Sequence, residues 1–301
     1  MINHGNFVKT VLVTGASTGF GRSTAETLAR AGHRVFASMR DIGNRNKAHA
    51  EALRTEKIAV VELDVTSTPS VEAAVRDVLL SAGRLDVVIN NAGIASAGVS
   101  EAFTPEQMRE LFDINVFGIQ RVLRAVLPTL RQQGDGLVIN VGSILGRVTF
   151  PFFGLYGASK HAVEALTDSY RYELSQLGVD VVLVQPSAYP TQMYGSAQQP
   201  ADKVRREAYG EFGSIPEKMF ATFGEIFNGE NAPNPNDVSE AIANLVNQAK
   251  GSRPARLVIG APYGSDVVNR QIEPVQAQVL ENLGLQQLAK LRQLPREDFC
   301  S

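Results

Sequence analysis

Short apolar runs alternate along the chain with longer stretches in which apolar positions recur at helical spacing. The runs are rich in Val, Ile and Leu and do not alternate strictly with polar residues, as expected for parallel strands that are buried on both faces. Seven runs are predicted to be strands: 9–14, 34–38, 58–63, 85–90, 137–141, 179–185 and 255–260.

Two of the intervening helices begin with recognisable capping residues. Thr104, Pro105 and Gln107 predict an N-cap, a proline at the first helical position and a capping box. Thr68 and Pro69 predict a second helix that opens in the same way. Strand–helix alternation sustained over most of the chain indicates an α/β fold with a doubly wound parallel sheet of about seven strands.

This rhythm breaks after the sixth predicted strand. Residues 186–236 are rich in Pro, Gly and aromatic residues and contain no clear strand. We interpret them as an insertion within one domain that spans residues 1–301. The C-terminal extension, 262–301, has leucines at helical spacing and balanced charges, which predicts a tail packed on the body or on a partner subunit.

Composition narrows the class of partner. The 301 residues include 44% hydrophobic and 20% charged residues with a formal net charge of −2, so a nucleic-acid partner is not expected. We expect neither a signal peptide nor a membrane span, since no suitable apolar run is present. The one cysteine, Cys300, allows no internal disulfide and suits the cytoplasm. The four histidines, among them His4 and His49, form no ligand pattern, so no metal site is expected.

The first predicted strand runs into a glycine-rich turn, TGASTGFG, at 14–21. A strand, a glycine turn and a helix N-terminus together favour binding of an anion such as a pyrophosphate, because backbone N–H groups and the helix dipole converge there. The spacing is G-x-x-x-G-x-G rather than G-x-G-x-x-G. A tight turn without a ligand is the alternative for these glycines taken alone.

The end of the second predicted strand bears on the choice of dinucleotide. Arg40 would suit the 2′-phosphate of NADP, whereas an acidic residue at this place would bind the ribose hydroxyls of NAD. Asp41 takes the acidic role if the strand ends one residue later. We predict NADP as the cofactor and Arg40 as the residue that selects it.

Four motifs stand in order along the chain: the glycine turn, NNAG at 90–93, Ser143, and YGASK at 156–160. Ser143 precedes Tyr156 by thirteen residues, and Tyr156 precedes Lys160 by four. In this order and register the chain resembles the short-chain dehydrogenase/reductase family, in its typical oxidoreductase branch. The resemblance covers 9 to about 191 well and the rest loosely, and it implies a Rossmann-type fold.

The spacing of Tyr156 and Lys160 places both side chains on one helix face. A nearby ammonium would lower the pKa of a phenol, which makes the tyrosine a better base near neutral pH. The resemblance implies that Tyr156 transfers a proton to or from the reacting oxygen, that Ser143 binds this oxygen, and that Lys160 also binds the nicotinamide ribose. It further implies that Asn115 holds a water in a proton relay to Lys160.

Further positions are carried over from the family one by one. Asp64 and Val65 would hold the adenine, while Pro186 and Thr191 match the ends of a P-G-x-x-x-T segment that binds the nicotinamide carboxamide. Ser187 departs from the family, which usually has Gly there, and this puts the local contacts in doubt. The full set implied to bind cofactor is Gly15, Ser17, Thr18, Gly19, Phe20, Gly21, Arg40, Asp64, Val65, Asn91, Ala92, Gly93, Tyr156, Lys160, Pro186 and Thr191.

The expected function is an NADP(H)-dependent carbonyl reductase or alcohol dehydrogenase. A dinucleotide-sensing regulator without catalysis is the alternative, although it would have no need for Ser143, Tyr156 and Lys160 together. A sugar-nucleotide epimerase of the extended branch shares the Tyr and Lys but differs in its glycine turn.

The segment 191–236 is predicted to be a mobile lid over an apolar substrate pocket, and this favours a hydrophobic ketone or aldehyde. Phe220, Phe223 and Phe227 form one helical stripe in it, which either lines the pocket or only packs the lid onto the body. The resemblance also implies a homo-oligomer, formed through helices at about 104–132 and 155–177.

Overall fold

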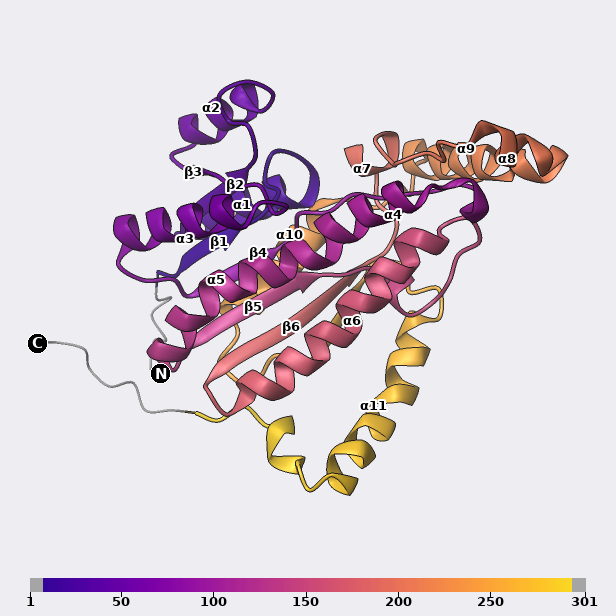
Figure 1. Cartoon of the computed structure of the whole chain (residues 1–301). Coiled ribbons are helices and arrows are strands. Elements are labelled where there is room, and N and C mark those ends of the chain that lie inside the picture. Colours follow the sequence, from indigo (N-terminus) through magenta and orange to yellow (C-terminus); the bar gives the residue numbers. More distant parts are fainter. Residues whose placement is uncertain (1–7, 294–301) are drawn as a thin grey trace, which may run out of the picture.

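The computed structural model describes residues 8–293, so His4 and Cys300 lie outside the described part. Seven parallel strands form one sheet in the order β3-β2-β1-β4-β5-β6-β7 (Figure 1). Every predicted strand is confirmed, within one or two residues at each end. The strands are β1 Thr10–Val13, β2 Arg34–Met39, β3 Ala59–Glu62, β4 Val87–Asn90, β5 Gly136–Val141, β6 Val179–Pro186 and β7 Arg256–Ile259.

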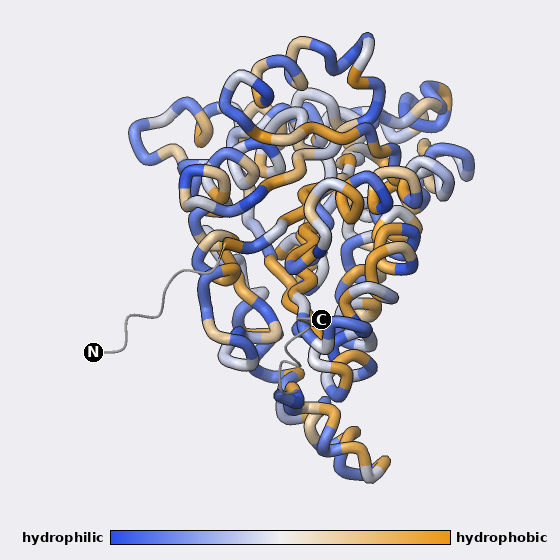
Figure 2. Tube along the Cα trace, turned by 90° about the vertical axis from the view of Figure 1, so that its left-hand side faces the viewer, coloured by the Kyte–Doolittle hydropathy of each residue, from blue (hydrophilic) through white to orange (hydrophobic). Residues whose placement is uncertain are grey.

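Helices cover both faces of this sheet and make a three-layer, doubly wound α/β fold. Residues of α1 (Gly19–Arg30), α2 (Lys47–Thr55) and α10 (Asn236–Asn247) pack in the core of one face. Residues of α3 (Thr68–Ala82), α5 (Gly118–Gln133) and α6 (Gly154–Ser175) pack in the core of the other. Apolar segments accordingly run through the middle of the molecule, and hydrophilic segments lie outside (Figure 2).

The structure tests the helix caps that were predicted for two helices. Thr104 accepts from the backbone N–H of Gln107 and caps α4 (Pro105–Phe112) with the predicted capping box. The prediction for α3 is wrong by one residue: its N-cap is Ser67, whose hydroxyl accepts from the N–H of Ser70, and Thr68 is already helical. Two successive hydroxyl residues can each cap a helix, and the pattern alone does not choose between them.

The segment after β6 folds into short helices. These are α7 (Gln192–Gly195), α8 (Lys203–Ala208) and α9 (Ile215–Asn228), with a 3₁₀ turn at Gly210–Ser214. Residues 187–236 form no strand beyond one bridge between Ser96 and Gln198. In Figure 1, α8 and α9 project past the end of the sheet beside α7 and α4.

The described part of the C-terminal extension, 262–293, contacts the body at a few points, and most of its helix is exposed, including Val267, Val275 and Val279. Helix α11 (Ser265–Asn282) leads to a 3₁₀ turn at Gln286–Ala289. The chain then returns to the end of α6, where the N–H of Arg292 donates to the carbonyl of Ser175 over 2.9 Å.

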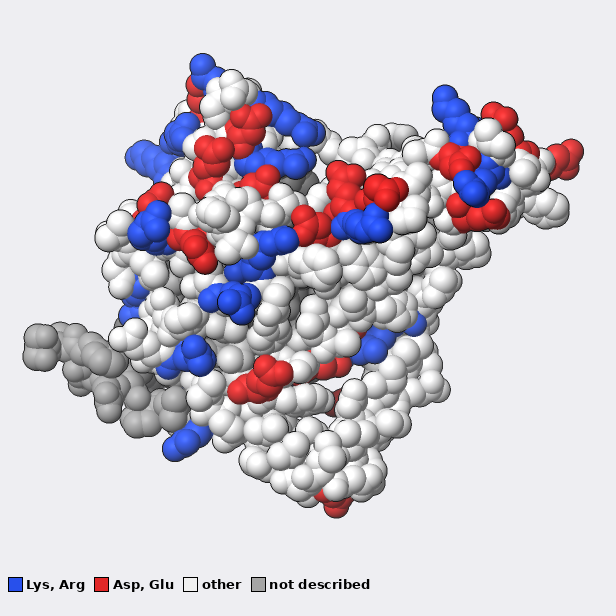
Figure 3. All heavy atoms as spheres, viewed as in Figure 1, with Lys and Arg blue, Asp and Glu red and all other residues white. Residues whose placement is uncertain are grey.

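Surface charge and helix length bear on partners. On the face in Figure 3, Lys and Arg side chains are interspersed with Asp and Glu, without a broad area of one sign. Among the described helices, none combines the length and apolarity that crossing a bilayer requires. Within residues 8–293, no group of three His, Cys, Asp or Glu side chains is placed to hold a metal ion.

Candidate active site

Strand order places a crevice at the carboxyl ends of β1 and β4. The chain leaves β1 toward β2 on one side and resumes at β4 on the other, so the connections diverge between these two neighbours. Open α/β sheets bind their ligands at such a point. The glycine turn follows β1 there, and the NNAG segment ends β4 and continues beyond it.

The glycine turn is too tight for side chains. Gly15 has a φ of +67°, and a Cβ on it would lie 2.7 Å from the Cα of Ala92. A Cβ on Gly21 would lie 2.4 Å from the carbonyl oxygen of Gly15. Thr18 is the N-cap of α1, yet its hydroxyl makes no capping bond. The first N–H groups of α1 therefore face the crevice beside a free hydroxyl, which fits the pyrophosphate of a dinucleotide.

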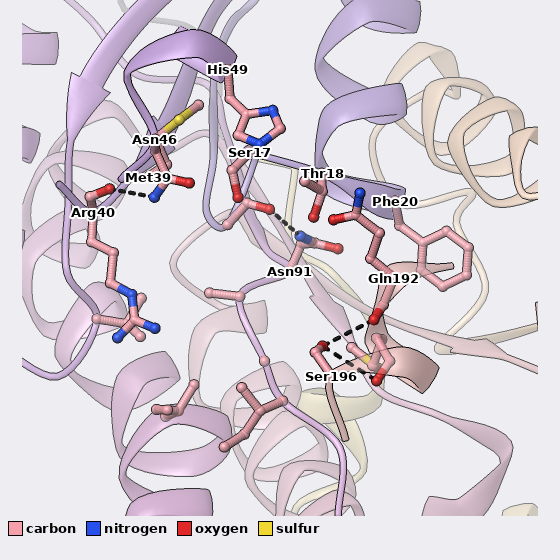
Figure 4. A pocket seen from close by; sticks show the side chains of 18 of the residues that line it. Ser17, Thr18, Phe20, Met39, Arg40, Asn46, His49, Asn91, Gln192 and Ser196 are labelled. Carbon is pink, nitrogen blue, oxygen red and sulfur yellow. Dashed lines mark hydrogen bonds between the residues drawn. The ribbon is translucent and has the colours of Figure 1, made fainter. Parts of the chain in front are cut away.

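Asn91 fastens this turn to the end of β4. Its side-chain amide donates to the carbonyls of Thr14 (2.9 Å) and Gly15 (3.1 Å), and its N–H donates to the Thr14 hydroxyl (3.0 Å). Figure 4 shows Asn91 between the turn and the helix that bears Gln192. Asn91 thus holds the shape of the crevice in addition to lining it.

A cavity of about 380 Å³ runs along the crevice. Most of the predicted cofactor residues line it: Gly15, Ser17, Thr18, Gly19, Phe20, Arg40, Asp64, Val65, Asn91, Ala92, Gly93 and Thr191. Gly21 is buried beneath the turn and does not line the cavity. Asp64 accepts from the N–H and the hydroxyl of Thr66, so its carboxylate stabilises the loop after β3.

At the far end of this cavity, β2 ends at Met39 and Arg40 follows as an exposed side chain. Asp41 has a φ of +53°, and its carboxylate accepts from Asn44 and from the N–H of Arg45 within the next turn. Asp41 does not line the cavity, whereas Arg40 does. The strand therefore ends where the NADP interpretation requires.

The same end of the cavity contains three residues that the sequence analysis missed. Arg45, Asn46 and His49 line it together with Arg40. Figure 4 labels Arg40, Asn46 and His49 among the lining residues. Asn46 donates to the carbonyl of Arg40 over 2.6 Å and holds the turn against the strand end. In the sequence, the only signal for this group was two arginines within six residues of a strand end. The conformation of the turn decides which of them reach the cavity.

A second, narrower cavity of about 70 Å³ continues from the first. Phe20, Asn91, Thr191 and Met193 line both. Ser143, Tyr156, Lys160 and Pro186 line the second, so the structure brings the proposed catalytic side chains together at the inner end of the crevice.

Aromatic rings close this second cavity. Phe150, Phe153, Tyr194 and Phe223 all line it. Of the three phenylalanines in the α9 stripe, only Phe223 faces the cavity. Tyr194 packs against all three of their rings, with centroid distances of 5.0–6.4 Å, so the stripe also holds α9 onto α7.

The pKa of Tyr156 differs from the value that the sequence predicts. Burial raises the pKa of Tyr156 to about 12, and a hydrogen bond with Ser143 lowers it only in part. The net direction is therefore opposite to the lowering expected from a nearby ammonium, because desolvation dominates the pKa of a fully buried phenol. Tyr156 therefore keeps its proton at neutral pH.

Lys160 is also buried, and its pKa is lowered to about 8 by that burial. Its ammonium nitrogen donates to the carbonyl of Val141 over 2.9 Å and lies 5.6 Å from the centre of the Tyr156 ring. The predicted shared helix face of Tyr156 and Lys160 is confirmed.

Asn115 occupies a π-helical turn, Asp113–Phe117, between α4 and α5. Its amide donates to the carbonyl of Ile94 (2.9 Å) and to the Ser159 hydroxyl (3.1 Å), and its oxygen accepts from the N–H of Ile94 (2.9 Å). Single π turns are frequent at functional sites. The side chain of Asn115 is used to join the loop after β4 to α6, so a role in a proton relay stays a prediction.

The family departure at Ser187 does not strain the backbone. Ser187 is absent from the left-handed region, and its N–H donates to the carbonyl of Ile259 over 2.9 Å. A serine is accepted there because the local conformation needs no glycine. Pro186, Ser187 and Thr191 all line the second cavity, and their contacts with the nicotinamide stay a prediction.

Comparison with known proteins agrees with this geometry. The family model described as short chain dehydrogenase matches residues 9–202. The chain is 31% identical over 262 residues to a 3-ketodihydrosphingosine reductase of Bacteroides thetaiotaomicron, covering 82% of this chain and 94% of the relative. It is 30% identical over 256 residues to human retinol dehydrogenase 8, covering 80% and 79%.

Solved structures give the same result. A variant of actinorhodin polyketide ketoreductase with NADPH superposes with a TM-score of 0.69 at 28% identity, over 84% of this chain and 95% of that chain. A 3-ketoacyl-(acyl-carrier-protein) reductase of Brucella melitensis with NADH superposes with a TM-score of 0.67 at 25% identity, over 83% and 96%. Relatives of this fold thus carry either dinucleotide.

Proposed function

The chain belongs to the short-chain dehydrogenase family, and from this premise we propose that it is an NADP(H)-dependent oxidoreductase that interconverts a hydrophobic carbonyl compound and its secondary alcohol. The observation that carries the proposal is the junction of the two cavities. A dinucleotide laid along the first would end where Ser143, Tyr156 and Lys160 line the second.

The proposed chemistry uses three side chains of the second cavity. When bound, the nicotinamide cofactor supplies the hydride for reduction. Ser143 donates a hydrogen bond to the carbonyl oxygen and stabilises the negative charge that develops on it. Tyr156 donates the proton to that oxygen, and its raised pKa suits an acid that must be protonated beforehand. Lys160 orients the ribose, and Asn115 holds the relay that returns the proton.

The preference for NADP rests on the cations at the outer end of the first cavity. Arg40 and Arg45 line that end with His49, while Asp41 turns its carboxylate into the adjoining turn. Guanidinium groups bind phosphate in bidentate fashion, and the 2′-phosphate on the adenine ribose is the group that distinguishes NADP from NAD. The remaining cofactor contacts are those that the family resemblance assigns.

The substrate preference rests on the rings around the second cavity. Phe150, Phe153, Tyr194 and Phe223 leave few polar atoms beyond the catalytic ones. We therefore propose residues 191–236 as a substrate lid. Two of the relatives, the 3-ketodihydrosphingosine reductase and the retinol dehydrogenase, are also named after lipophilic substrates.

Two coarser features complete the proposal. The protein is proposed to form a homodimer through α5 and α6, as the family resemblance implies. A cytoplasmic location is proposed because a chain with one cysteine suits a reducing compartment.

The experiment is a screen of purified protein with NADPH and with NADH against a panel of ketones and aldehydes, followed by loss of the reduced nicotinamide absorbance. We expect turnover of bulky hydrophobic carbonyls, faster with NADPH. Tight cofactor binding without turnover of any panel member would contradict the enzyme and favour the dinucleotide-sensing regulator.

A further inference from the structure

The C-terminal helix α11 lies outside the residues that the family model matches. One of its side chains nevertheless lies behind the turn that carries Ser143. Asn269 accepts from the Nε of Arg147 over 3.0 Å. Its own amide donates to the side-chain oxygen of Gln185 over 2.7 Å. All three residues lie at least partly out of solvent, so these bonds form in a low-dielectric setting.

Two further contacts close a ring. The amide of Gln185 donates to the carboxylate of Glu164. The other oxygen of this carboxylate lies 3.0 Å from the Nη2 of Arg147. Arg147, Asn269, Gln185 and Glu164 therefore form a four-residue ring, with one member each from the turn after β5, α11, β6 and α6.

Three of these contacts are hydrogen bonds that run from the guanidinium through both amides to the carboxylate, and the direct ion pair between Arg147 and Glu164 closes the ring. Reversing either amide would place two donors or two acceptors face to face. The order of the ring is therefore fixed, and it links a cation to an anion through neutral groups that polarise one another.

Three members stand next to the proposed functional residues. Ser143 and Arg147 are four residues apart and flank the same 3₁₀ turn, Ile144–Gly146. Glu164 is one helical turn beyond Lys160 on α6, and Gln185 directly precedes Pro186. The ring thus has members on the backbone segments that carry Ser143, Lys160 and Pro186.

The turn that carries Ser143 also rests directly on α6. A Cβ on Gly146 would lie 2.9 Å from the Cγ of Glu164 and 3.0 Å from the carbonyl oxygen of Lys160. Because this contact is so close, a shift of Glu164 or Arg147 moves the turn, and with it the Ser143 hydroxyl, relative to Tyr156.

The charged members are a poor place to test the ring. The side chain of Glu164 is 4% exposed, and it is also paired with Arg256, whose Nε lies 2.9 Å away. Arg256 pairs in turn with Asp168. Removing one charge from this buried group of two arginines and two carboxylates leaves another unpaired and destabilises the whole fold. Asn269 is neutral, so replacing it leaves every charge of this group paired, and the loss is limited to one hydrogen bond each for Arg147 and Gln185.

We propose that Asn269 is a positioning residue for the hydride-transfer site, and that α11 serves through it to fix the Ser143 turn against α6. The proposal rests on the proposed function for its kinetic consequence. Its structural part, the restraint of residues 142–149, is independent of any activity.

The test is Asn269→Leu, which keeps the volume and removes both hydrogen bonds. We expect kcat for carbonyl reduction to fall roughly ten- to a hundredfold, since small misplacements of reacting groups are costly. The dissociation constant for NADPH should stay within about threefold, because the glycine turn makes no contact with the ring. Amide hydrogen exchange should become faster in 142–149 and stay unchanged in 10–30.

Two controls separate positioning from general destabilisation. Arg270→Ala breaks the exposed pair with Asp266 on the same helix and should change neither kcat nor exchange. The double variant Asn269→Leu with Gln185→Leu should lose no more kcat than the worse single variant, as expected for residues that act as a unit.

Wild-type kcat in Asn269→Leu, or faster exchange spread equally over 10–30 and 142–149, would overturn the proposal. If the wild type shows no turnover, the proposed function fails. Amide hydrogen exchange in Asn269→Leu then still tests the structural part of the proposal. Faster exchange confined to 142–149 supports the restraint by the ring, and unchanged exchange overturns it.

Discussion

At the scale of single residues, the proton affinities of Tyr156 and Lys160 depend on packing that the sequence does not display. Their four-residue spacing predicts a shared helix face, and the structure confirms it. The spacing also suggested that the lysine lowers the pKa of the phenol, but burial raises that pKa to about 12. Whether a side chain is fully buried depends on segments distant in sequence, such as the lid residues Tyr194 and Phe223 at the same cavity, so the direction could not be read from the motif.

The lowered pKa of Lys160 has a consequence for stability. Burial lowers its pKa in the folded chain to about 8, below the ordinary lysine value of 10.5. Between these values the unfolded chain binds a proton that the folded chain has released, so rising pH favours the folded state. We predict that wild type gains about 1 kcal/mol per pH unit relative to Lys160→Met between about pH 8 and 10.

The measurement is urea unfolding of both proteins at several pH values in that window. Tyr156 acts in the opposite direction, but only above its ordinary range near pH 10, and it is present in both proteins. Free energies of unfolding that run parallel with pH would show that Lys160 titrates normally in the folded chain.

Arg40 is the residue on which cofactor choice depends in our account. Arg40→Ala should weaken NADPH binding by roughly tenfold or more and change NADH binding little, because only NADPH carries the 2′-phosphate. Fluorescence titration with both cofactors measures this. Arg54→Ala removes an exposed charge from the neighbouring helix α2 without touching the cavity, and it should leave both affinities unchanged. Equal losses for the two cofactors in Arg40→Ala would make Arg40 a structural residue.

At the scale of elements, apolar runs predicted the strands well because both faces of this sheet are covered. The strands β1, β4, β5 and β6 are buried throughout, so an apolar composition alone marks them, whereas the edge strands β3 and β7 are only partly buried. Turns were harder. The turn after β2 brings Arg45 and His49 to the cavity through the left-handed Asp41, and no periodicity signals such a conformation.

The lid is predicted to close over substrate through Phe223. Cofactor together with a bulky ketone should slow proteolysis within 203–228 more than cofactor alone, since ordering the lid buries its exposed backbone. Phe223→Ala should reduce this protection and lower kcat/KM for that ketone by roughly tenfold, as expected for the loss of part of a buried ring.

Phe212→Ala is the matched control, because its ring is on the same segment but 70% exposed. It should leave both proteolysis and kcat/KM as in wild type. A cleavage rate in 203–228 that ignores ligands, or equal effects of the two variants, would count against the lid.

At the scale of the whole molecule, strand–helix alternation predicted the doubly wound sheet, and the position of the crevice followed from the strand order. The position of α11 did not follow. Its leucine spacing indicated a helix, but the packing of Asn269 behind the Ser143 turn depends on contacts across 84 and 122 residues of sequence, which no local pattern encodes.

The oligomeric state is the remaining property at this scale. Phe117 is 52% exposed where the π turn leads into α5, and the middle of α6 carries few charged side chains on the same face (Figure 3). We predict a dimer through α5 and α6 that Phe117→Asp dissociates, because a buried carboxylate without a partner is costly. Val204→Asp, on the exposed lid helix α8, should remain dimeric. Light scattering at micromolar concentration measures both, and a wild-type monomer would refute the interface.

The most direct test of the central claim is single-turnover reduction of a hydrophobic ketone by Tyr156→Phe with bound NADPH. The substitution removes one hydroxyl from a packed ring, so NADPH affinity should stay within a few-fold of wild type. Our account predicts that the rate falls at least about a hundredfold, because the phenol supplies the proton as carbonyl reduction proceeds. A variant that binds NADPH normally and retains more than a few per cent of the wild-type rate would contradict the assignment of Tyr156 and the mechanism built on it.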